Sequence, residues 1–147
     1  MKVLITGGCG FIGSNFIRYI LTDTEVDNKI DVINLDKITY AGSGKNIEHM
    51  NLAEHKRYRF IKADICDKNT VNSIILHEKP DVIFNFAAES HVDRSISDSD
   101  EFEKTNFIGA CNIFKSALNN NIKKVVQVST DEVYGSIDQG SFSEESK

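Results

Sequence analysis

Short runs of hydrophobic residues alternate along the chain with longer stretches in which hydrophobic residues recur every three or four positions. The short runs are typical of strands and the longer stretches of helices. A regular order of strand and helix predicts parallel strands joined by crossover helices. The runs that we expect to form strands are Val3–Thr6, Asp31–Leu35, Tyr58–Lys62, Val82–Phe86 and Val125–Ser129.

Two hydrophobic stripes at helical spacing should face this sheet. A shorter helix is predicted from about Lys68 to Glu78, with Asp67 as its N-cap and Pro80 after its end. Residues 39–54 are rich in Gly, Ser and Asn, which predicts a loop followed by a weak helix. The first stripe consists of Phe16, Ile17, Ile20 and Leu21, and the second of Phe107, Ala110, Cys111, Phe114, Ala117 and Leu118.

A chain of 147 residues can form one domain with a core of its own. We expect an α/β fold with a doubly wound parallel sheet, similar to the Rossmann fold. After the fifth strand the sequence runs through polar residues to Lys147 without a closing helix, which would leave one face of the sheet uncovered. Residues 1–147 are therefore expected to be an incomplete domain that stops after the fifth strand.

Charge and composition narrow the possible partners. Seventeen Lys and Arg residues against twenty-two Asp and Glu residues give a net charge of −5 without a basic patch, which argues against nucleic acid. No hydrophobic run reaches the roughly 18 residues of a membrane span. The three cysteines, Cys9, Cys66 and Cys111, are odd in number and far apart, which argues against a disulfide framework or a zinc site. We expect a reduced, cytoplasmic protein without a metal.

A glycine-rich turn directly follows the first predicted strand. It reads Thr6-Gly7-Gly8-Cys9-Gly10-Phe11-Ile12-Gly13 and leads into a predicted helix. Gly7 allows a tight turn, Gly10 lets the backbone approach a pyrophosphate, and Gly13 lets the helix pack closely on the strand. Spaced glycines alone more often mark an ordinary turn. The strand before them and the helix after them favour a dinucleotide site here.

Acidic residues end the next two predicted strands. Asp36, at the end of the second strand, can accept hydrogen bonds from the adenosine ribose and would repel a 2′-phosphate, which favours NAD over NADP. Alternatively, Asp36 only begins a turn, and the neighbouring Lys37 leaves the choice of cofactor open. Asp64 and Ile65 follow the third strand, where they could contact the adenine. Asp64 could equally cap the turn before the next helix.

Polar residues also follow the fourth and fifth predicted strands, at the edge of the sheet where such folds bind ligands. After the fourth strand, Ala87 and Ala88 are small enough to lie against a flat cofactor, and His91 and Arg94 could face a substrate or be ordinary surface residues. After the fifth, Asp131 and Glu132 are adjacent. Beside a buried cofactor, desolvation and mutual repulsion would raise the pKa of one carboxyl and leave the other ionised, which supplies one acid and one base.

Four segments carry a resemblance to a known family: Thr6–Phe16, Leu35–Gly42, Ala87–Ser95 and Ser129–Gly135. Together they resemble the extended short-chain dehydrogenase/reductase superfamily and, within it, the dTDP-glucose 4,6-dehydratases. The glycine motif is shared across the superfamily. The segments from Asp36 to Gly42 and from Thr130 to Gly135 are more specific to the dehydratases, and the match covers essentially the whole chain.

The resemblance implies an internal redox dehydration of dTDP-glucose, in which hydride passes from C4 to NAD and back to C6 after water leaves across C5 and C6. It implies that Glu132 removes the C5 proton, Asp131 protonates the departing C6 hydroxyl, and Thr130 hydrogen-bonds the C4 oxygen. Ser90 would approach the sugar. The residues implied to contact NAD are Gly7, Gly10, Phe11, Ile12, Gly13, Asp36, Lys37, Thr39, Asp64, Ile65, Ala87 and Ala88.

The chain departs from the family pattern at two points. The superfamily's Tyr-x-x-x-Lys pair, which removes the C4 hydroxyl proton, is absent, because Asp138 stands four residues after Tyr134. In family members this pair and the substrate domain lie further along the chain, so we expect residues 1–147 alone to be the N-terminal NAD-binding part and to be inactive or nearly so. The second departure is Gly44, an extra glycine in the segment Ala41–Lys45 that could loosen the adenine side.

Two other functions remain open. An NAD-dependent sugar-nucleotide epimerase or decarboxylase shares the first half of the machinery, although epimerisation at C4 has no elimination step that needs Asp131 and Glu132. A dinucleotide-binding module without a reaction of its own is the other alternative. The family also implies a homodimer for the full-length protein and a role in deoxysugar supply, such as L-rhamnose for surface polysaccharide.

Overall fold

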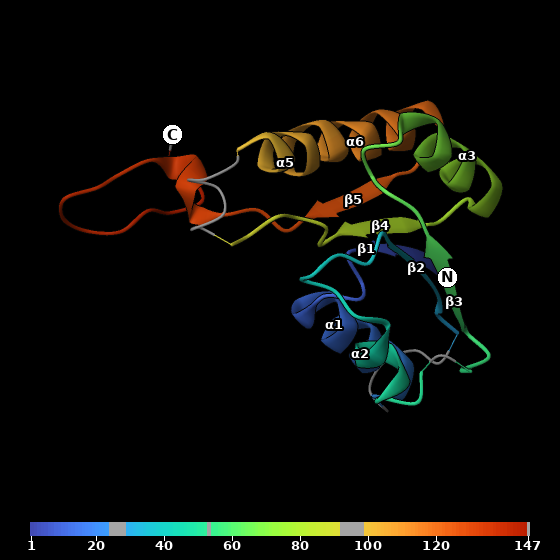
Figure 1. Cartoon of the computed structure of the whole chain (residues 1–147). Coiled ribbons are helices and arrows are strands. Elements are labelled where there is room, and N and C mark those ends of the chain that lie inside the picture. The colour runs from blue at the N-terminus through green and yellow to red at the C-terminus, as the bar shows by residue number, and fades with distance from the viewer. Residues whose placement is uncertain (24–28, 53, 92–98, 147) are drawn as a thin grey trace.

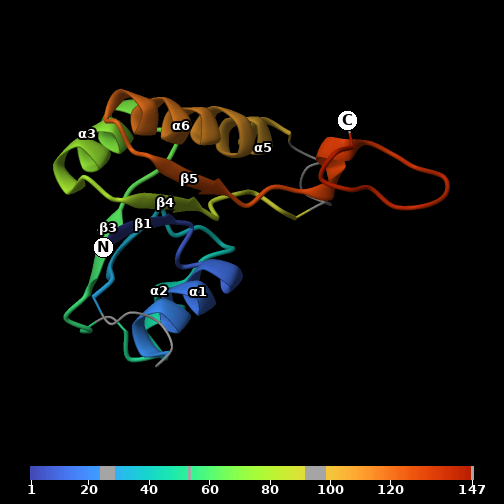
Figure 2. The same cartoon turned by 180° about the vertical axis from the view of Figure 1, so that it is seen from behind.

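The computed structural model describes residues 1–23, 29–52, 54–91 and 99–146. It contains a five-stranded sheet in the order β3-β2-β1-β4-β5, and all four strand pairs are parallel. Helices cover both faces of the sheet (Figures 1 and 2), so the expected doubly wound, Rossmann-like α/β fold is confirmed. The strands are β1 (Lys2–Thr6), β2 (Asp31–Asp36), β3 (Tyr58–Lys62), β4 (Val82–Asn85) and β5 (Lys124–Gln127).

The order of the strands reverses beside β1. The chain passes from β1 outward to β2 and β3, then returns to β4 on the other side of β1, where Val3 pairs with Val82. Residues Val3–Thr6 are at most 1% exposed, because helices cover this central strand from both sides. In open α/β sheets a ligand crevice lies beyond the carboxyl ends of the strands at such a reversal.

One face of the sheet packs against α1 (Phe11–Thr22) and α2 (Gly44–Glu48). Ile17, Ile20 and Leu21 of the first predicted stripe are buried there, and Phe16 packs at the edge of the same core. The α2 helix has only five residues, in agreement with the weak helix expected after the loop. Hydrophobic periodicity therefore identified the buried face of α1 correctly.

The opposite face packs against α3 (Lys68–Glu78) and α6 (Ala110–Asn119). The Asp67 side chain accepts hydrogen bonds from the backbone N–H groups of Asn69 and Thr70, each at 3.1 Å, as an N-cap does. Lys79 ends the helix with a left-handed backbone (φ 48°) immediately before Pro80. The bounds and the cap predicted for this helix are confirmed.

The second predicted stripe faces the sheet only in part. The short α5 (Asp100–Phe102), a π-helical segment η1 (Glu103–Gly109) and α6 follow one another, and Ala110 and Ala117 are buried with Ile113. The three large residues of the stripe point away from the sheet: Phe107 is 70% exposed, Phe114 43% and Leu118 78%. Two hydrophobic stripes share this helix, and the one with the smaller residues packs against the sheet. Periodicity does not distinguish between them.

The segment after β5 extends away from the rest of the molecule (Figures 1 and 2). It contains the 3-10 helix η2 (Asp131–Tyr134), and the rings of Tyr134 and Phe142 stack with their centroids 5.3 Å apart. The strand β5 itself ends at Gln127, two residues earlier than the sequence predicted. None of the helices in the described ranges is long and apolar enough to cross a bilayer.

Candidate functional site

A pocket lies at the carboxyl ends of β1, β2 and β4, where the strand order reverses. It encloses about 520 Å³ of space, part of which is open to solvent. Its walls come from the glycine-rich turn, the loops that follow β2, β3 and β4, and the π-helical segment η1. The lining residues are Gly7, Gly10, Leu35, Asp36, Lys37, Thr39, Ala41, Gly42, Ala63, Asp64, Ile65, Phe86, Ala87, Ala88, Glu89 and Thr105.

The glycine-rich turn takes its shape from close backbone contacts. Gly7 has a left-handed φ of 68°, and a Cβ atom there would lie 2.6 Å from the backbone N of Ala87. At Gly13 a Cβ atom would lie 2.3 Å from the carbonyl oxygen of Gly7. Only glycine fits at either position, because a side chain would push the turn away from β4 or α1 away from the turn.

The turn leads into the N-terminus of α1, which begins at Phe11. The first N–H groups of a helix have no partner within it and carry the positive end of the helix dipole, so they can bind an anion. Phe11 and Ile12 are 82% and 59% exposed at this end of the helix. Their backbone amides are suited to a phosphate group, whereas their side chains are not part of the pocket lining.

Asp36 connects the turn to the end of β2. Its Oδ2 accepts a hydrogen bond from the backbone N–H of Cys9 at 2.8 Å, and its Oδ1 accepts one from the N–H of Ile38 at 2.7 Å. The side chain lines the pocket although the residue is only 8% exposed. Each carboxylate oxygen keeps a further acceptor position. Asp36 therefore both holds the loop after β2 and can accept a hydrogen bond from a ligand hydroxyl.

Lys37, Asp64 and Ile65 form the wall on the side of β3. The Lys37 Nζ lies 3.5 Å from Oδ2 of Asp64. The other carboxylate oxygen of Asp64, Oδ1, accepts a hydrogen bond from the backbone N–H of Cys66 at 2.9 Å. Asp64 therefore stabilises the turn before α3, which is the alternative role considered from the sequence. It also lines the pocket.

Glu89 and Thr105 are lining residues that sequence reasoning missed. Glu89 is only 9% exposed, and its Oε2 accepts a hydrogen bond from the Tyr40 hydroxyl at 2.8 Å. The Thr105 hydroxyl is buried without a hydrogen-bond partner among the described residues. Glu89 directly follows the two alanines at the end of β4, which was a usable signal. Nothing in the local sequence marks Thr105, a polar residue within a helical stretch.

A buried polar cluster of Asn34, Tyr58 and Cys9 lies against the glycine-rich turn. The amide Nδ2 of Asn34 donates hydrogen bonds to the Tyr58 hydroxyl at 2.9 Å and to the Cys9 Sγ at 3.5 Å. Burial, with a smaller contribution from the nearby Asp36 charge, raises the pKa of the Cys9 thiol to about 11. Burial likewise raises the pKa of Tyr58 to about 12. Cys9 is therefore an uncharged packing residue and not a nucleophile.

The residues expected to carry the chemistry lie outside this pocket. Thr130, Asp131 and Glu132 are exposed on the segment that extends beyond β5. The Thr130 hydroxyl accepts a hydrogen bond from the Glu132 N–H at 3.3 Å, as an N-cap of η2. The described residues do not enclose the Asp131 and Glu132 carboxylates, so this part of the protein does not bury the pair as the sequence predicted. Ser90 and His91 are exposed, and Arg94 lies outside the described residues.

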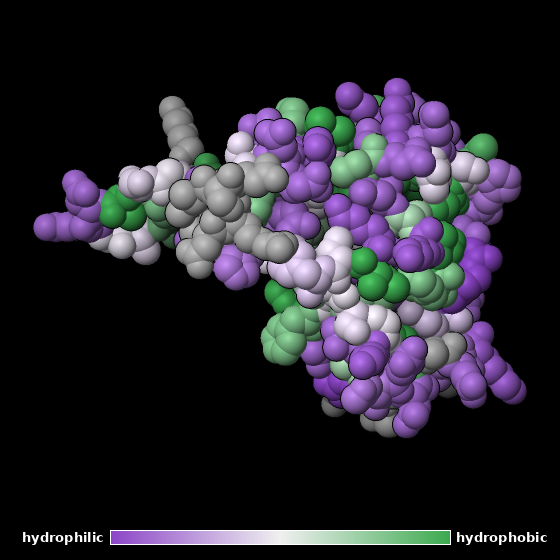
Figure 3. Space-filling view, in the orientation of Figure 1, coloured by the Kyte–Doolittle hydropathy of each residue, from purple (hydrophilic) through white to green (hydrophobic). Residues whose placement is uncertain are grey.

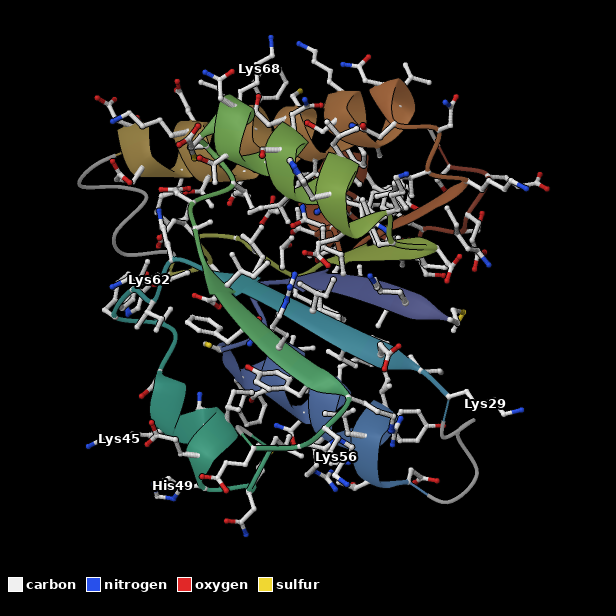
Figure 4. The ribbon with its side chains drawn as sticks, turned by 90° about the vertical axis from the view of Figure 1, so that its right-hand side faces the viewer. Lys29, Lys45, His49, Lys56, Lys62 and Lys68 are labelled. Atoms are coloured by element: carbon white, nitrogen blue, oxygen red, sulfur yellow. The ribbon has the colours of Figure 1, made fainter. Side chains whose placement is uncertain are left out.

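Basic side chains do not gather at one place on the side of the molecule shown in Figure 4. The labelled residues are spread around the edge of that view: Lys29, Lys45, His49, Lys56, Lys62 and Lys68.

Within the described ranges, no three His, Cys, Asp or Glu side chains converge as metal ligands would.

The fold and the pocket define a Rossmann-like α/β protein with a glycine-rich turn at the point where the strand order reverses. The chain belongs to the family described as GDP-mannose 4,6 dehydratase, whose model matches residues 4–147. The resemblance to 4,6-dehydratases noted from the sequence is confirmed.

Three known proteins illustrate the similarity. The low-salt glycan biosynthesis protein Agl12 of Haloferax volcanii is 47% identical over 146 residues, which are 99% of this chain and 44% of that protein. The dTDP-glucose 4,6-dehydratase DesIV of Streptomyces venezuelae, solved with NAD bound, superposes with a TM-score of 0.90 at 43% identity, covering 100% of this chain and 45% of that one. The UDP-Glc/GlcNAc 4-epimerase of Campylobacter jejuni gives a TM-score of 0.85 at 30% identity, with 99% and 42% coverage. The chain thus spans less than half the length of these proteins.

Proposed function

We propose that the protein is an NAD-dependent sugar-nucleotide 4,6-dehydratase that converts dTDP-glucose to dTDP-4-keto-6-deoxyglucose, and that residues 1–147 form its NAD-binding domain. The observation that carries the proposal is the pocket in which Asp36 and Gly7 lie at the reversal of strand order. The 43% identity to a dTDP-glucose 4,6-dehydratase solved with NAD supports it. The substrate domain would lie outside residues 1–147.

The residues of the pocket fit NAD by their chemistry. The turn at Gly7, Gly10 and Gly13, with the first amides of α1 at Phe11 and Ile12, would hold the pyrophosphate. The buried Asp36 carboxylate would accept hydrogen bonds from the ribose and exclude a 2′-phosphate, which favours NAD over NADP. Further contacts are assigned to Lys37, Thr39, Asp64, Ile65, Ala87 and Ala88.

NAD, when bound, would accept hydride from C4 of the sugar and return it to C6. The remaining steps belong to residues of the protein. The tyrosine of the family's Tyr-x-x-x-Lys pair, outside residues 1–147, would take the C4 hydroxyl proton while Thr130 hydrogen-bonds the C4 oxygen. Glu132 would take the proton from C5, and Asp131 would give a proton to the C6 hydroxyl, which leaves as water. Glu132 would return its proton to C5 when hydride reaches C6. Ser90 would contact the sugar. These roles need the segment after β5 to be enclosed by further protein, since all three residues are exposed in the described part of the chain.

An epimerase is the second candidate, supported by the 30% identity to a UDP-sugar 4-epimerase over 99% of this chain. Both reactions begin with oxidation at C4, so the cofactor pocket does not separate them. The adjacent Asp131 and Glu132 favour the dehydratase, because elimination of water needs a second acid and base beyond the group that takes the C4 hydroxyl proton, whereas epimerisation at C4 has no elimination step.

Isotope tracing separates the two candidates. The complete gene product would be incubated with NAD and dTDP-glucose carrying deuterium at C4, and the product analysed by mass spectrometry and NMR. A dehydratase loses water and moves the deuterium to C6. Inversion of configuration at C4, with the deuterium still on C4 and no loss of water, would identify an epimerase. The variant Glu132→Gln should abolish dehydration while leaving C4 oxidation partly intact, and an unchanged rate would contradict the role of Glu132.

We further propose a homodimer formed through a hydrophobic stripe on η1 and α6, called the exposed stripe below. It consists of the exposed residues Phe107, Phe114 and Leu118 and the half-buried Cys111. Its members follow one another at intervals of four, three and four positions, the spacing of a helix–helix seam. Figure 3 shows hydrophobic side chains interrupting the hydrophilic surface along the helical upper edge of the molecule.

We also propose that the protein is cytoplasmic and that it acts in deoxysugar supply, such as that of L-rhamnose. The three free cysteines support a reducing environment.

A further inference from the structure

Two loops that form different walls of the pocket are joined by one side-chain hydrogen bond. The Tyr40 hydroxyl, on the loop after β2, donates to Oε2 of Glu89, on the loop after β4, at 2.8 Å. The two residues are 49 positions apart in the sequence. Thr39 and Ala41, on either side of Tyr40, line the pocket, as Glu89 itself does. The bond therefore fixes the separation of the two walls.

Glu89 is also held from a third segment. Its backbone N–H donates to Oδ1 of Asn106 at 2.8 Å, and the Asn106 Nδ2 donates back to the Glu89 carbonyl oxygen at 2.8 Å. Asn106 belongs to the π-helical segment η1 and follows Thr105, another lining residue. Tyr40, Glu89 and Asn106 thus form a continuous link, called here the Tyr40–Asn106 link, from the loop after β2 to η1.

The link has a physical consequence for binding. A nearly buried carboxylate such as Glu89 is unfavourable without hydrogen bonds, and a donor to a charged group makes a stronger bond than one between neutral groups. The contacts that satisfy Glu89 order both loops before any ligand enters. A binding site that is ordered in advance does not lose that conformational entropy when the ligand binds.

We infer that Tyr40 and Asn106 are positioning residues for the dinucleotide pocket, acting through the Glu89 side chain and the Glu89 backbone respectively. The inference rests on the proposed function, in which this pocket binds NAD. Neither residue needs to touch the cofactor, since each acts by holding Glu89 and the walls joined to it.

The first test removes one oxygen atom. Tyr40→Phe should raise the Kd for NAD about three- to tenfold in isothermal titration calorimetry, because losing a bond to a charged group lowers the population of the ordered pocket. The melting temperature without NAD should stay close to that of the wild type, since the Tyr40 side chain is half exposed. Tyr19→Phe is the matched control, because Tyr19 is 48% exposed on α1. An unchanged Kd for Tyr40→Phe, or an equal rise for Tyr19→Phe, overturns the inference.

The second test asks whether the effect passes through the Glu89 side chain. In a Glu89→Ala background, Tyr40→Phe should raise the Kd by a smaller factor than it does in the wild type. Asn106→Ala should still raise the Kd in that background, because Asn106 bonds only to the Glu89 backbone in the link. If Tyr40→Phe weakens binding equally in both backgrounds, Tyr40 does not act through Glu89.

The third test is independent of NAD. Amide hydrogen exchange without cofactor should be severalfold faster at Glu89 in Tyr40→Phe than in the wild type or in Tyr19→Phe, since the amide is protected within the link. Equal exchange rates in all three overturn the inference. Failure of the wild type to bind NAD instead contradicts the proposed function. The exchange rates still decide whether Tyr40 positions the pocket walls.

Discussion

The backbone N–H of Cys9 donates a hydrogen bond to Oδ2 of Asp36 across 2.8 Å, joining the glycine-rich turn after β1 to the end of β2. The carbonyl oxygen of Cys9 accepts two more hydrogen bonds, from the N–H of Ser43 at 3.0 Å and from Nδ2 of Asn46 at 2.8 Å. The loop before α2 and α2 itself therefore hold the next peptide group of the turn, between Cys9 and Gly10. These contacts set the shape of the turn that we propose binds the pyrophosphate.

Removal of the Asp36 carboxylate should affect both stability and cofactor choice. In Asp36→Ala the buried N–H of Cys9 and the partly buried N–H of Ile38 lose their acceptor, so the free energy of unfolding should fall by about 1–3 kcal/mol. The Kd for NAD should rise, and the preference for NAD over NADP should narrow. Urea unfolding and calorimetric titration measure these effects. Asp31→Ala, at the exposed opposite end of β2, is the control and should change stability by no more than about 0.5 kcal/mol.

The close contact at Gly13 predicts a large effect of one methyl group. In Gly13→Ala the new Cβ would lie 2.3 Å from the Gly7 carbonyl oxygen, so the protein should lose about 1–3 kcal/mol of stability and bind NAD more weakly. At Gly44, in α2, the nearest atom to a Cβ would be 3.9 Å away. Gly44→Ala should therefore leave stability unchanged or raise it by up to about 0.5 kcal/mol. Thermal unfolding compares the two, and equal losses would contradict the packing argument.

The buried thiol of Cys9 predicts a loss of stability at alkaline pH. An unperturbed thiol has a pKa of 9.0, whereas burial raises the pKa of Cys9 to about 11 in the folded protein. Between these values the unfolded chain has lost the proton that the folded protein keeps, so the free energy of unfolding falls as the pH rises from 9 to 11. Tyr58, whose pKa rises from 10.0 to about 12, extends the fall to higher pH.

Urea unfolding at several pH values measures this slope. Cys9→Ala should show a shallower decline above pH 9 than the wild type, because one of the groups with a raised pKa is gone. Cys111→Ala, which alters a half-buried thiol outside this cluster, serves as the control. A decline of the same steepness in Cys9→Ala and in the wild type would mean that the Cys9 thiol does not cause it.

The exposed stripe on η1 and α6 predicts the oligomeric state. If it forms the proposed dimer, Leu118→Glu should produce monomers in sedimentation analysis, because a carboxylate would be buried within the seam. Leu118 is 78% exposed within one chain, so the substitution should not disturb the fold. Lys115→Glu, which places a carboxylate at another exposed position of α6, is the control. A dimer that survives Leu118→Glu would locate the interface elsewhere.

Much of the fold could be predicted because its signals are local. Five short hydrophobic runs specified the strands to within two residues, and Asp67 with Pro80 bounded α3, since capping and proline geometry act within one helical turn. The glycines at 7, 10 and 13 and the acidic residue at 36 pointed to the same end of the sheet. Parallel strands bring their carboxyl ends together, so order along the chain was enough to predict this part of the pocket.

The remaining features depend on contacts between distant segments. Sequence periodicity could not tell which stripe of α6 faces the sheet, because the choice depends on how closely its small residues approach β4 and β5. Glu89 and Thr105 line the pocket because the loop after β4 lies beside the π-helical segment in the folded protein. The Tyr40 hydroxyl donates a hydrogen bond to Glu89, which is 49 positions away in the sequence. Local sequence determined the elements and the turn that could bind a dinucleotide. Only the tertiary structure decided which side chains complete and hold its pocket, because their hydrogen bonds join residues that no local pattern relates.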